Sequence, residues 1–201
     1  MIEVEKDFIL SEEAERRLAA VATSVTEKQL RDVYYDTPDF AWTTRDHWLR
    51  SRNGVFELKI RTRAQSTGAV SQYQEIENED DIRKTLRISV QGTLSEDLRT
   101  AGFVEVCDCE TQRTEYRVGA FVVDVDRASF AGTSFVFQTA EIELMVEHPE
   151  DVAEAEKRIL EFAPIHGFRE PPTQRGKVLS YIAHEKPEHF QALVASGADV
   201  F

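Results

Sequence analysis

This chain of 201 residues has little cysteine, no long apolar run and no excess of positive charge. Its two cysteines lie in the segment VCDC, too close on one strand face for an ordinary disulfide and without the second pair that a zinc site needs. We therefore predict reduced structural thiols and a reducing compartment. No run of about 18 apolar residues occurs, so no membrane-spanning helix is predicted.

Acidic side chains outnumber basic ones by 37 to 24, which gives a formal net charge of −13. Binding to nucleic acid through the general field of a protein requires a basic surface, so the net charge argues against this class, while a local basic cluster stays compatible with it. The sequence also lacks the glycine-rich phosphate loop, the dinucleotide glycine motif and the serine-hydrolase elbow. The N-terminus MIEVEKDF matches no signal or transit peptide. We expect a cytoplasmic monomer with no nucleic-acid and no membrane partner.

The chain has the size and composition of one folded domain, with 41% hydrophobic and 30% charged residues. Folding at this size buries roughly 70% of the surface that the unfolded chain exposes, which provides a sizeable core. Segments with a period of two predict a β-rich domain with helices. The predicted strands are Ile2–Leu10, Leu30–Asp36, His47–Arg52, Val55–Arg61, Ser71–Glu77, Phe103–Cys109, Thr111–Val118, Phe121–Arg127 and Phe135–Val146. The predicted helices are Glu12–Ala22 after a Ser11 cap, a short one capped by Ser95 before Gly102, Pro149–Ile165, Thr173–Ala183 and Pro187–Ala195.

Charged side chains gather on one face of these strands. The pair Asn53-Gly54 predicts a two-residue hairpin loop, which places Arg50 opposite Glu57 on the same face. An antiparallel sheet with one solvated face would alternate in the same way. Alternatively, the sheet closes into a barrel with a charged interior, which requires neutralisation by opposite charges, metals or a charged ligand. A polyphosphate held with divalent cations would meet that requirement, since arginine matches phosphate oxygens and carboxylates suit Mg²⁺ or Mn²⁺.

Eight motifs, in order along the chain, resemble the CYTH superfamily of triphosphate tunnel metalloenzymes. They are IEVEKDF, VYYDTP, DHWLRSR, FELKIR, TQRTEY, VDVD, EIEL and RGKVLSYI. The resemblance implies one CYTH domain over residues 1–201 with an α+β fold, a closed antiparallel eight-stranded β-barrel flanked by helices. It also implies a hydrolase of phosphoanhydride bonds that uses Mg²⁺, or Mn²⁺, as cofactor. The segment DHWLR is most similar to thiamine triphosphatases, which implies that thiamine triphosphate is cleaved to thiamine diphosphate and phosphate.

The same resemblance implies roles for individual residues. The expected metal ligands are Glu3, Glu5, Asp124, Glu141 and Glu143. The expected substrate-binding residues are Trp48, Arg50, Arg52, Lys59, Arg113 and Lys177, with Trp48 stacking on the thiamine moiety. Among all of these, catalytic roles are expected for Glu3, Glu5, Lys59 and Arg113.

One position departs from the family pattern E-x-E-x-K, because Asp7 stands where the lysine belongs. Either a β-bulge turns Lys6 inward, or the tunnel has lost a positive charge and gained a negative one. Two alternatives therefore stay open beside thiamine triphosphate. The first is the same chemistry on inorganic tripolyphosphate or a nucleoside triphosphate, or the adenylate cyclase activity of the superfamily. The second is a non-catalytic phosphate-binding module.

Overall fold

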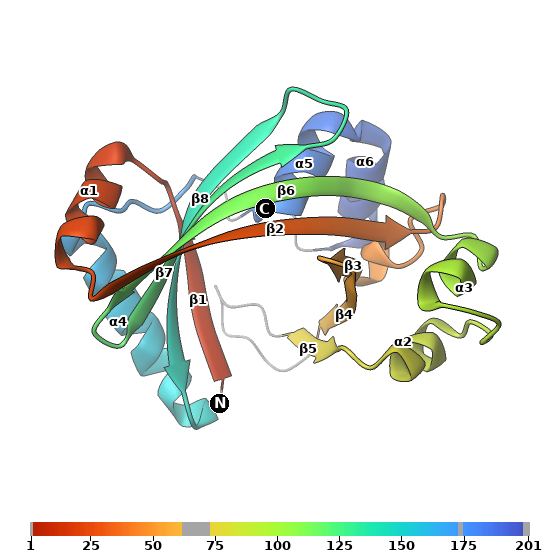
Figure 1. Cartoon of the computed structure of the whole chain (residues 1–201), viewed down its shortest axis with the longest axis horizontal. Coiled ribbons are helices and arrows are strands. Elements are labelled where there is room, and N and C mark those ends of the chain that lie inside the picture. The colour runs from red at the N-terminus through yellow and green to blue at the C-terminus, as the bar shows by residue number, and fades with distance from the viewer. Residues whose placement is uncertain (1, 62–72, 173–174, 199–201) are drawn as a thin grey trace.

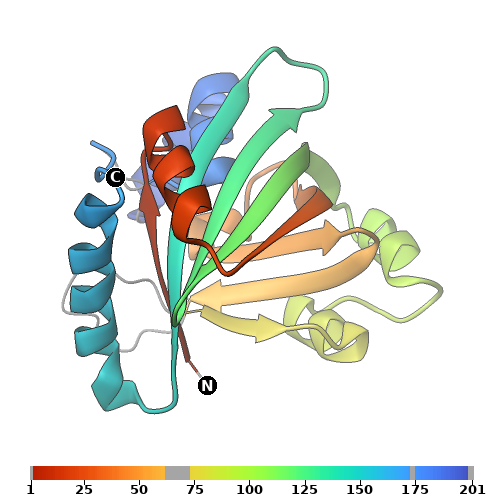
Figure 2. The same ribbon diagram turned by 60° about the vertical axis from the view of Figure 1, so that its left-hand side comes forward.

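The computed structural model describes residues 2–61, 73–172 and 175–198, and within them eight antiparallel strands form one curled sheet (Figure 1, Figure 2). The order of the strands across the sheet is β1-β8-β7-β6-β2-β3-β4-β5. Their bounds are β1 (Ile2–Phe8), β2 (Ser24–Asp36), β3 (His47–Arg52), β4 (Val55–Arg61), β5 (Tyr73–Ile76), β6 (Val104–Val118), β7 (Phe121–Phe130) and β8 (Val136–Val146). Residues 71 and 72 of one predicted strand lie outside the described residues.

The expectation of a closed barrel is not confirmed, because the sheet is an open half-barrel over the described residues. Its edge strands β1 and β5 are not paired with each other within that part of the chain. The short strand β5 pairs only with Leu58–Arg61 at the end of β4. Closing a sheet requires strands long and staggered enough for the last to reach the first, and these four residues of β5 do not reach β1.

The predicted hairpin between β3 and β4 is confirmed residue by residue. Arg50 lies opposite Glu57 and Trp48 opposite Lys59. The loop residues Asn53 and Gly54 have φ values of 50° and 88°, as the tight mirror-image turn requires. Two strands were predicted, at Phe103–Cys109 and Thr111–Val118. The structure has one strand there, β6, which continues through Glu110 without a break.

Three apolar clusters hold helices against the sheet. On its outer face, α1 (Glu12–Val21) and α4 (Val152–Ile165) cover one end, where Leu18 and Ile159 pack against β1, β7 and β8. At the other end of the outer face, α2 (Glu79–Leu86) and α3 (Leu94–Thr100) pack on β3 and β4. The last two helices, α5 (Lys177–Glu185) and α6 (Pro187–Ser196), instead cover part of the inner face beside β2, β6 and β7. These elements leave the remaining inner face lined by charged side chains.

The helix termini differ from the prediction in two places. The short helix before Gly102 is capped by Thr93 rather than Ser95, because Thr93 and Glu96 form a reciprocal capping box. Helix α2, which was not predicted, begins after Asn78, whose side chain accepts hydrogen bonds from two backbone amides of the first turn. The segment Pro149–Asp151 is a 3₁₀ turn that leads into α4. Residues 173 and 174 of a further predicted helix lie outside the described residues, and α5 starts at Lys177.

The two cysteines are free and buried, as predicted. Among the described residues, each helix is too short or too polar to cross a bilayer.

Candidate active site

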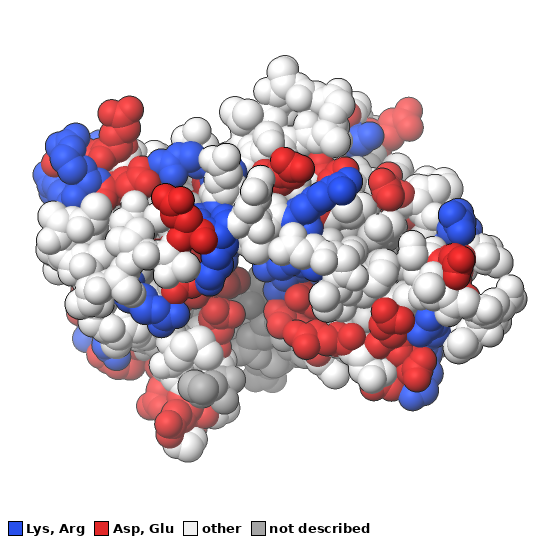
Figure 3. Space-filling model, in the orientation of Figure 1, with Lys and Arg blue, Asp and Glu red and all other residues white. Residues whose placement is uncertain are grey.

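The curl of the sheet encloses a cavity of about 360 Å³ on its inner face. Its carboxylate wall comes mainly from β1 and β8, and its basic residues come from β3, β4, β6 and the start of α5. Figure 3 shows basic and acidic side chains gathered around the hollow at the centre of the view. The predicted residues that line this cavity are Glu3, Glu5, Arg50, Arg52, Lys59, Arg113, Glu141, Glu143 and Lys177. The alternation of charged and apolar residues along the strands therefore does bring these charged side chains together.

Strand register places the acidic residues next to one another. Glu5 lies opposite Glu143 in the β1–β8 pair, and Asp124 lies opposite Glu141 in the β7–β8 pair. The three carboxylates of Glu3, Glu5 and Glu143 offer oxygens within 4.8 Å of one another, and so do those of Asp124, Glu141 and Glu143. Glu3 and Glu5 are exposed, Glu141 and Glu143 are half-buried, and Asp124 is buried. Close like charges are costly where they are buried unless a cation or a proton offsets them.

The electrostatics of the acidic wall reflect this crowding. Burial, with the charge of Asp124 next, raises the pKa of Glu143 to about 8. Burial also raises the pKa of Glu141 well above its ordinary value, and the neighbouring charge of Glu5 adds to the effect. Burial is also the main cause that raises the pKa values of Glu5 and Asp124. Arg113, which contacts Asp124 and Glu141, offsets only part of the negative charge of this wall.

The donor set fits a hard divalent cation. All of its atoms are carboxylate oxygens, the ligands that Mg²⁺ and Mn²⁺ prefer. In addition, Oδ1 of Asp124 is buried and has no hydrogen-bond partner within the described part of the chain. A buried polar atom without a partner is rare in folded proteins, and coordination to a cation would satisfy this oxygen.

Each of the five basic residues of the cavity already has a carboxylate partner. Lys59 Nζ lies 2.6 Å from Glu75, and Arg50 lies 2.9 Å from Glu57. Arg113 binds Asp126 through Nε at 2.7 Å and also contacts Asp124. These pairs compensate buried charge in the absence of any ligand. An incoming anion must therefore compete with carboxylates for the same donors.

Asp32 organises the remaining two cations and was missed by the sequence analysis. It is completely buried on β2 and accepts two hydrogen bonds from Arg52, at 2.7 and 3.0 Å. Its Oδ2 also accepts from Lys177 Nζ at 3.1 Å, while Lys177 donates to Thr111 at 2.8 Å. Burial alone would raise the pKa of Asp32, but the hydrogen bonds from Arg52 and the charge of Lys177 hold it at about 2. Asp32 thus fixes the start of α5 against β3.

Trp48 lines a second cavity of about 250 Å³ that adjoins the first. The two cavities share Arg50, Lys59, Gly176 and Lys177 as lining residues. We call the second cavity the side alcove; its other lining residues are Tyr34, Asp46, Trp48, Val178, Leu179 and Ala198. Its lining is mainly apolar or aromatic away from the shared cations, which suits an organic group attached to a chain of phosphates.

The structure also decides between the two arrangements considered for Asp7. Pairing of Ile2–Phe8 with Val146–Ala140 is continuous, so the chain runs through this segment without a bulge. Lys6 points away from the cavity and forms an ion pair with Glu170 at 3.3 Å. Asp7 lines the cavity. The position where the resemblance predicts a lysine is therefore occupied by an inward-facing acid.

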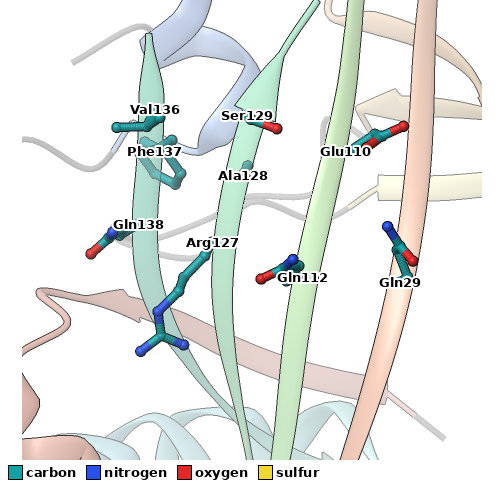
Figure 4. Close-up of a pocket in the computed structure, with 9 residues that line it drawn as sticks. All are labelled: Gln29, Glu110, Gln112, Arg127, Ala128, Ser129, Val136, Phe137 and Gln138. Carbon is teal, nitrogen blue, oxygen red and sulfur yellow. The ribbon is translucent and has the colours of Figure 1, made fainter. Parts of the chain in front are cut away.

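Another depression, of about 260 Å³, lies on the outer face of the same strands (Figure 4). Gln112 and Arg127, which line it, are sequence neighbours of the inward-facing Arg113 and Asp126, and therefore point the opposite way. Its other polar lining is mostly amide and hydroxyl side chains. The paired carboxylates and cations are concentrated on the inner face, so the inner cavity is the stronger candidate.

Comparison with known proteins agrees with the fold and the motifs. The sequence model of the CYTH domain matches residues 1–174. The thiamine-triphosphatase of Homo sapiens is 27% identical over 206 residues, covering 96% of this chain and 90% of the human protein. That of Macaca fascicularis is 26% identical over the same shares.

Two solved structures show the same fold at lower identity. The PH1819 protein of Pyrococcus horikoshii OT3 superposes with a TM-score of 0.62 at 21% identity, covering 92% of this chain and 100% of its own. HpAC1 from Hippeastrum, for which a dominant triphosphatase activity is described, has a TM-score of 0.55 at 16% identity and covers 90% of this chain and 94% of its own.

Proposed function

The chain belongs to the CYTH domain family, and on this basis we propose that it hydrolyses the terminal phosphoanhydride bond of thiamine triphosphate. The observation that carries the proposal is the pair of joined cavities. One is lined by opposed carboxylates and cations, and the other is a mainly apolar alcove that contains Trp48. The similarity to two thiamine-triphosphatases over 96% of the chain supports this substrate.

The basic residues would bind and orient the triphosphate. Arginine presents parallel donors that match phosphate oxygens, and lysine supplies a compact positive charge. Phosphoryl transfer depends mainly on positioning and on neutralising charge, so no covalent nucleophile is required. Water adds to the terminal phosphorus, the bond from that phosphorus to the bridging oxygen breaks, and thiamine diphosphate and phosphate are released. The residues proposed for binding are Arg50, Arg52, Lys59, Arg113 and Lys177.

The carboxylate wall would hold the divalent cation. Its proposed ligands are Glu3, Glu5, Asp124, Glu141 and Glu143. When bound, Mg²⁺ or Mn²⁺ would supply positive charge to phosphoryl oxygens as a Lewis acid. Burial and neighbouring carboxylates raise the pKa values of Glu141 and Glu143, so binding of the cation would favour loss of protons from these groups.

The side alcove would take the thiamine moiety. The thiazolium ring of thiamine is cationic, and an indole face attracts such a ring by stacking and by its quadrupole. Trp48 lines the alcove beside Arg50 and Lys59, which also line the main cavity. One molecule could therefore contact the indole with its ring while its phosphates contact the cations.

The lining of the main cavity favours a simpler substrate, inorganic tripolyphosphate. The main cavity alone is lined almost entirely by charged or polar side chains, with Phe137 as the only large apolar one among its described lining residues. Inorganic tripolyphosphate would need nothing beyond that cavity. Hydrolysis of tripolyphosphate, or of a nucleoside triphosphate, is thus the second candidate.

Phosphate release from a substrate panel separates these candidates. Purified protein is incubated with thiamine triphosphate, tripolyphosphate and ATP, each with Mg²⁺, with Mn²⁺ or with EDTA. The proposal predicts metal-dependent release with the highest kcat/KM for thiamine triphosphate. A preference for tripolyphosphate would support the second candidate, whereas binding without release from any substrate would indicate a non-catalytic module.

A further inference from the structure

A short turn before β3 fixes the ring of Trp48. The 3₁₀ turn Thr43–Arg45 ends at Asp46, whose backbone adopts φ 60° and ψ 41°. This left-handed conformation is open to Gly, Asn and Asp but costly for most other residues. The backbone N–H of Asp46 donates to Thr43 at 2.9 Å, and its carbonyl accepts from the N–H of Arg61 at 3.2 Å. The Cα of Asp46 is therefore held between β3 and the end of β4.

The side chain of Asp46 reaches the indole directly. Trp48 Nε1 donates to Asp46 Oδ1 at 2.7 Å, and Arg61 Nη1 donates to Asp46 Oδ2 at 3.1 Å. A hydrogen bond to an ionised acceptor is stronger and shorter than a neutral one. With both carboxylate oxygens engaged, the carboxylate plane and the indole bound to it have little rotational freedom.

We infer that Asp46 is a positioning residue for substrate specificity, which acts by holding the indole of Trp48 in the orientation that stacks on the organic group of the triphosphate. The inference rests on the proposed function for its substrate and adds a residue to which no role was assigned. Stacking requires a ring in a defined plane, and a ring that is already fixed loses less entropy when the substrate binds. Asp46 lines the side alcove but not the main cavity, so its effect should be confined to substrates that carry an organic group.

Two substitutions of Asp46 distinguish a role in positioning the indole of Trp48 from a general loss of folding. Asp46→Gly keeps the left-handed backbone available and removes the acceptor. Asp46→Asn tolerates the same backbone and keeps an oxygen that can accept from the indole N–H. If positioning is the role, Asp46→Gly raises the KM for thiamine triphosphate about tenfold with a much smaller change in kcat. The KM for tripolyphosphate stays unchanged. Asp46→Asn, which keeps an acceptor for the indole but not the second one for Arg61, raises the KM for thiamine triphosphate less than Asp46→Gly does.

A fluorescence measurement keeps the test independent of turnover. The chain has two tryptophans, so a Trp42→Phe background isolates the emission of Trp48. We expect Asp46→Gly to increase acrylamide quenching of that emission, and Asp46→Asn to increase it less. If the wild type hydrolyses no thiamine triphosphate, the proposed substrate fails while quenching still tests whether Asp46 holds the ring. Equal quenching in all three proteins, an equal rise in KM for both substrates, or an Asp46→Asn variant as impaired as Asp46→Gly would each overturn the inference.

Discussion

Thr139 Oγ1 donates a 3.0 Å hydrogen bond to Asp7 Oδ1 inside the main cavity, which fixes an acid at an inward-facing position of β1. Burial raises the pKa of Asp7, and the hydrogen bond from Thr139 opposes that rise. Asp7 adds negative charge to a wall that already holds Glu3, Glu5, Glu141 and Glu143. A triphosphate entering this cavity therefore meets repulsion from β1 as well as attraction from β3 and β4.

Reversing the charge of Asp7 should improve substrate binding. Asp7→Lys changes the charge at the cavity wall by two units, and at an effective dielectric constant of about 20 this lowers the KM for the triphosphate roughly fivefold or more. Initial rates are measured at a cation concentration that saturates both proteins. Asp7→Asn, which removes only one charge, is the matched control and should fall between them. An unchanged or higher KM for Asp7→Lys would show that Asp7 does not oppose the substrate.

Removal of one acid from the proposed cation site should abolish most turnover. Glu5→Gln keeps the size of the side chain but replaces a carboxylate ligand with a neutral amide. We expect kcat to fall by about two orders of magnitude or more while the circular dichroism spectrum stays the same. The control is Glu12→Gln, because Glu12 is an exposed acid on α1. Normal activity with the normal dependence on Mg²⁺ would remove Glu5 from the reaction.

Truncating Trp48 should distinguish thiamine triphosphate from simpler substrates. Stacking on an aromatic ring contributes on the order of 1 kcal/mol, so Trp48→Ala should weaken hydrolysis of thiamine triphosphate roughly tenfold. Tripolyphosphate, which has no ring, serves as the internal control and should be hydrolysed at a similar rate by both proteins. Equal losses for the two substrates would make Trp48 a packing residue and favour the generic triphosphatase.

Acid should weaken the fold through Asp32. Its pKa is about 2 in the folded protein and near 3.8 in the unfolded chain, so the stabilisation is complete above about pH 4 and is lost as the pH falls towards 2. Between pH 5 and pH 3 the loss from this group amounts to about 1 kcal/mol. Urea unfolding, followed by circular dichroism, gives the free energy of unfolding at each pH. The free-energy difference between wild type and Asp32→Asn should shrink by that amount, and a pH-independent difference would contradict the assignment.

Local patterns in the sequence were enough to predict the inner face of the sheet. The alternation of charged and apolar residues and the Asn53-Gly54 turn depend on neighbours in the chain, so the Arg50–Glu57 register follows from them. The meeting of Asp32 with Lys177 depends on where α5 docks, at a sequence separation of 145, and no local pattern encodes it. Asp46 was missed for another reason, since its importance lies in a left-handed turn and not in a residue spacing.

The open edge of the sheet was not predictable for a similar reason. Closure depends on the length and stagger of β5 relative to β1, whereas alternation only says which face each residue occupies. The way in which the charged inner face of the sheet is neutralised was also only partly predicted. A charged interior was expected to be neutralised by opposite charges, metals or a charged ligand, and pairs such as Lys59 with Glu75 already compensate much of the basic wall. The acidic wall is left as the part that still needs a cation.

Phosphorus NMR of thiamine triphosphate incubated with the wild-type protein tests the central claim most directly, because it identifies the bond that is cleaved as well as the rate. With Mg²⁺ we predict equimolar appearance of thiamine diphosphate and orthophosphate, loss of the reaction in EDTA and its return when excess Mg²⁺ is added. Persistence of the triphosphate signals with both Mg²⁺ and Mn²⁺, or release of pyrophosphate with thiamine monophosphate in place of orthophosphate, would contradict cleavage of the terminal phosphoanhydride bond.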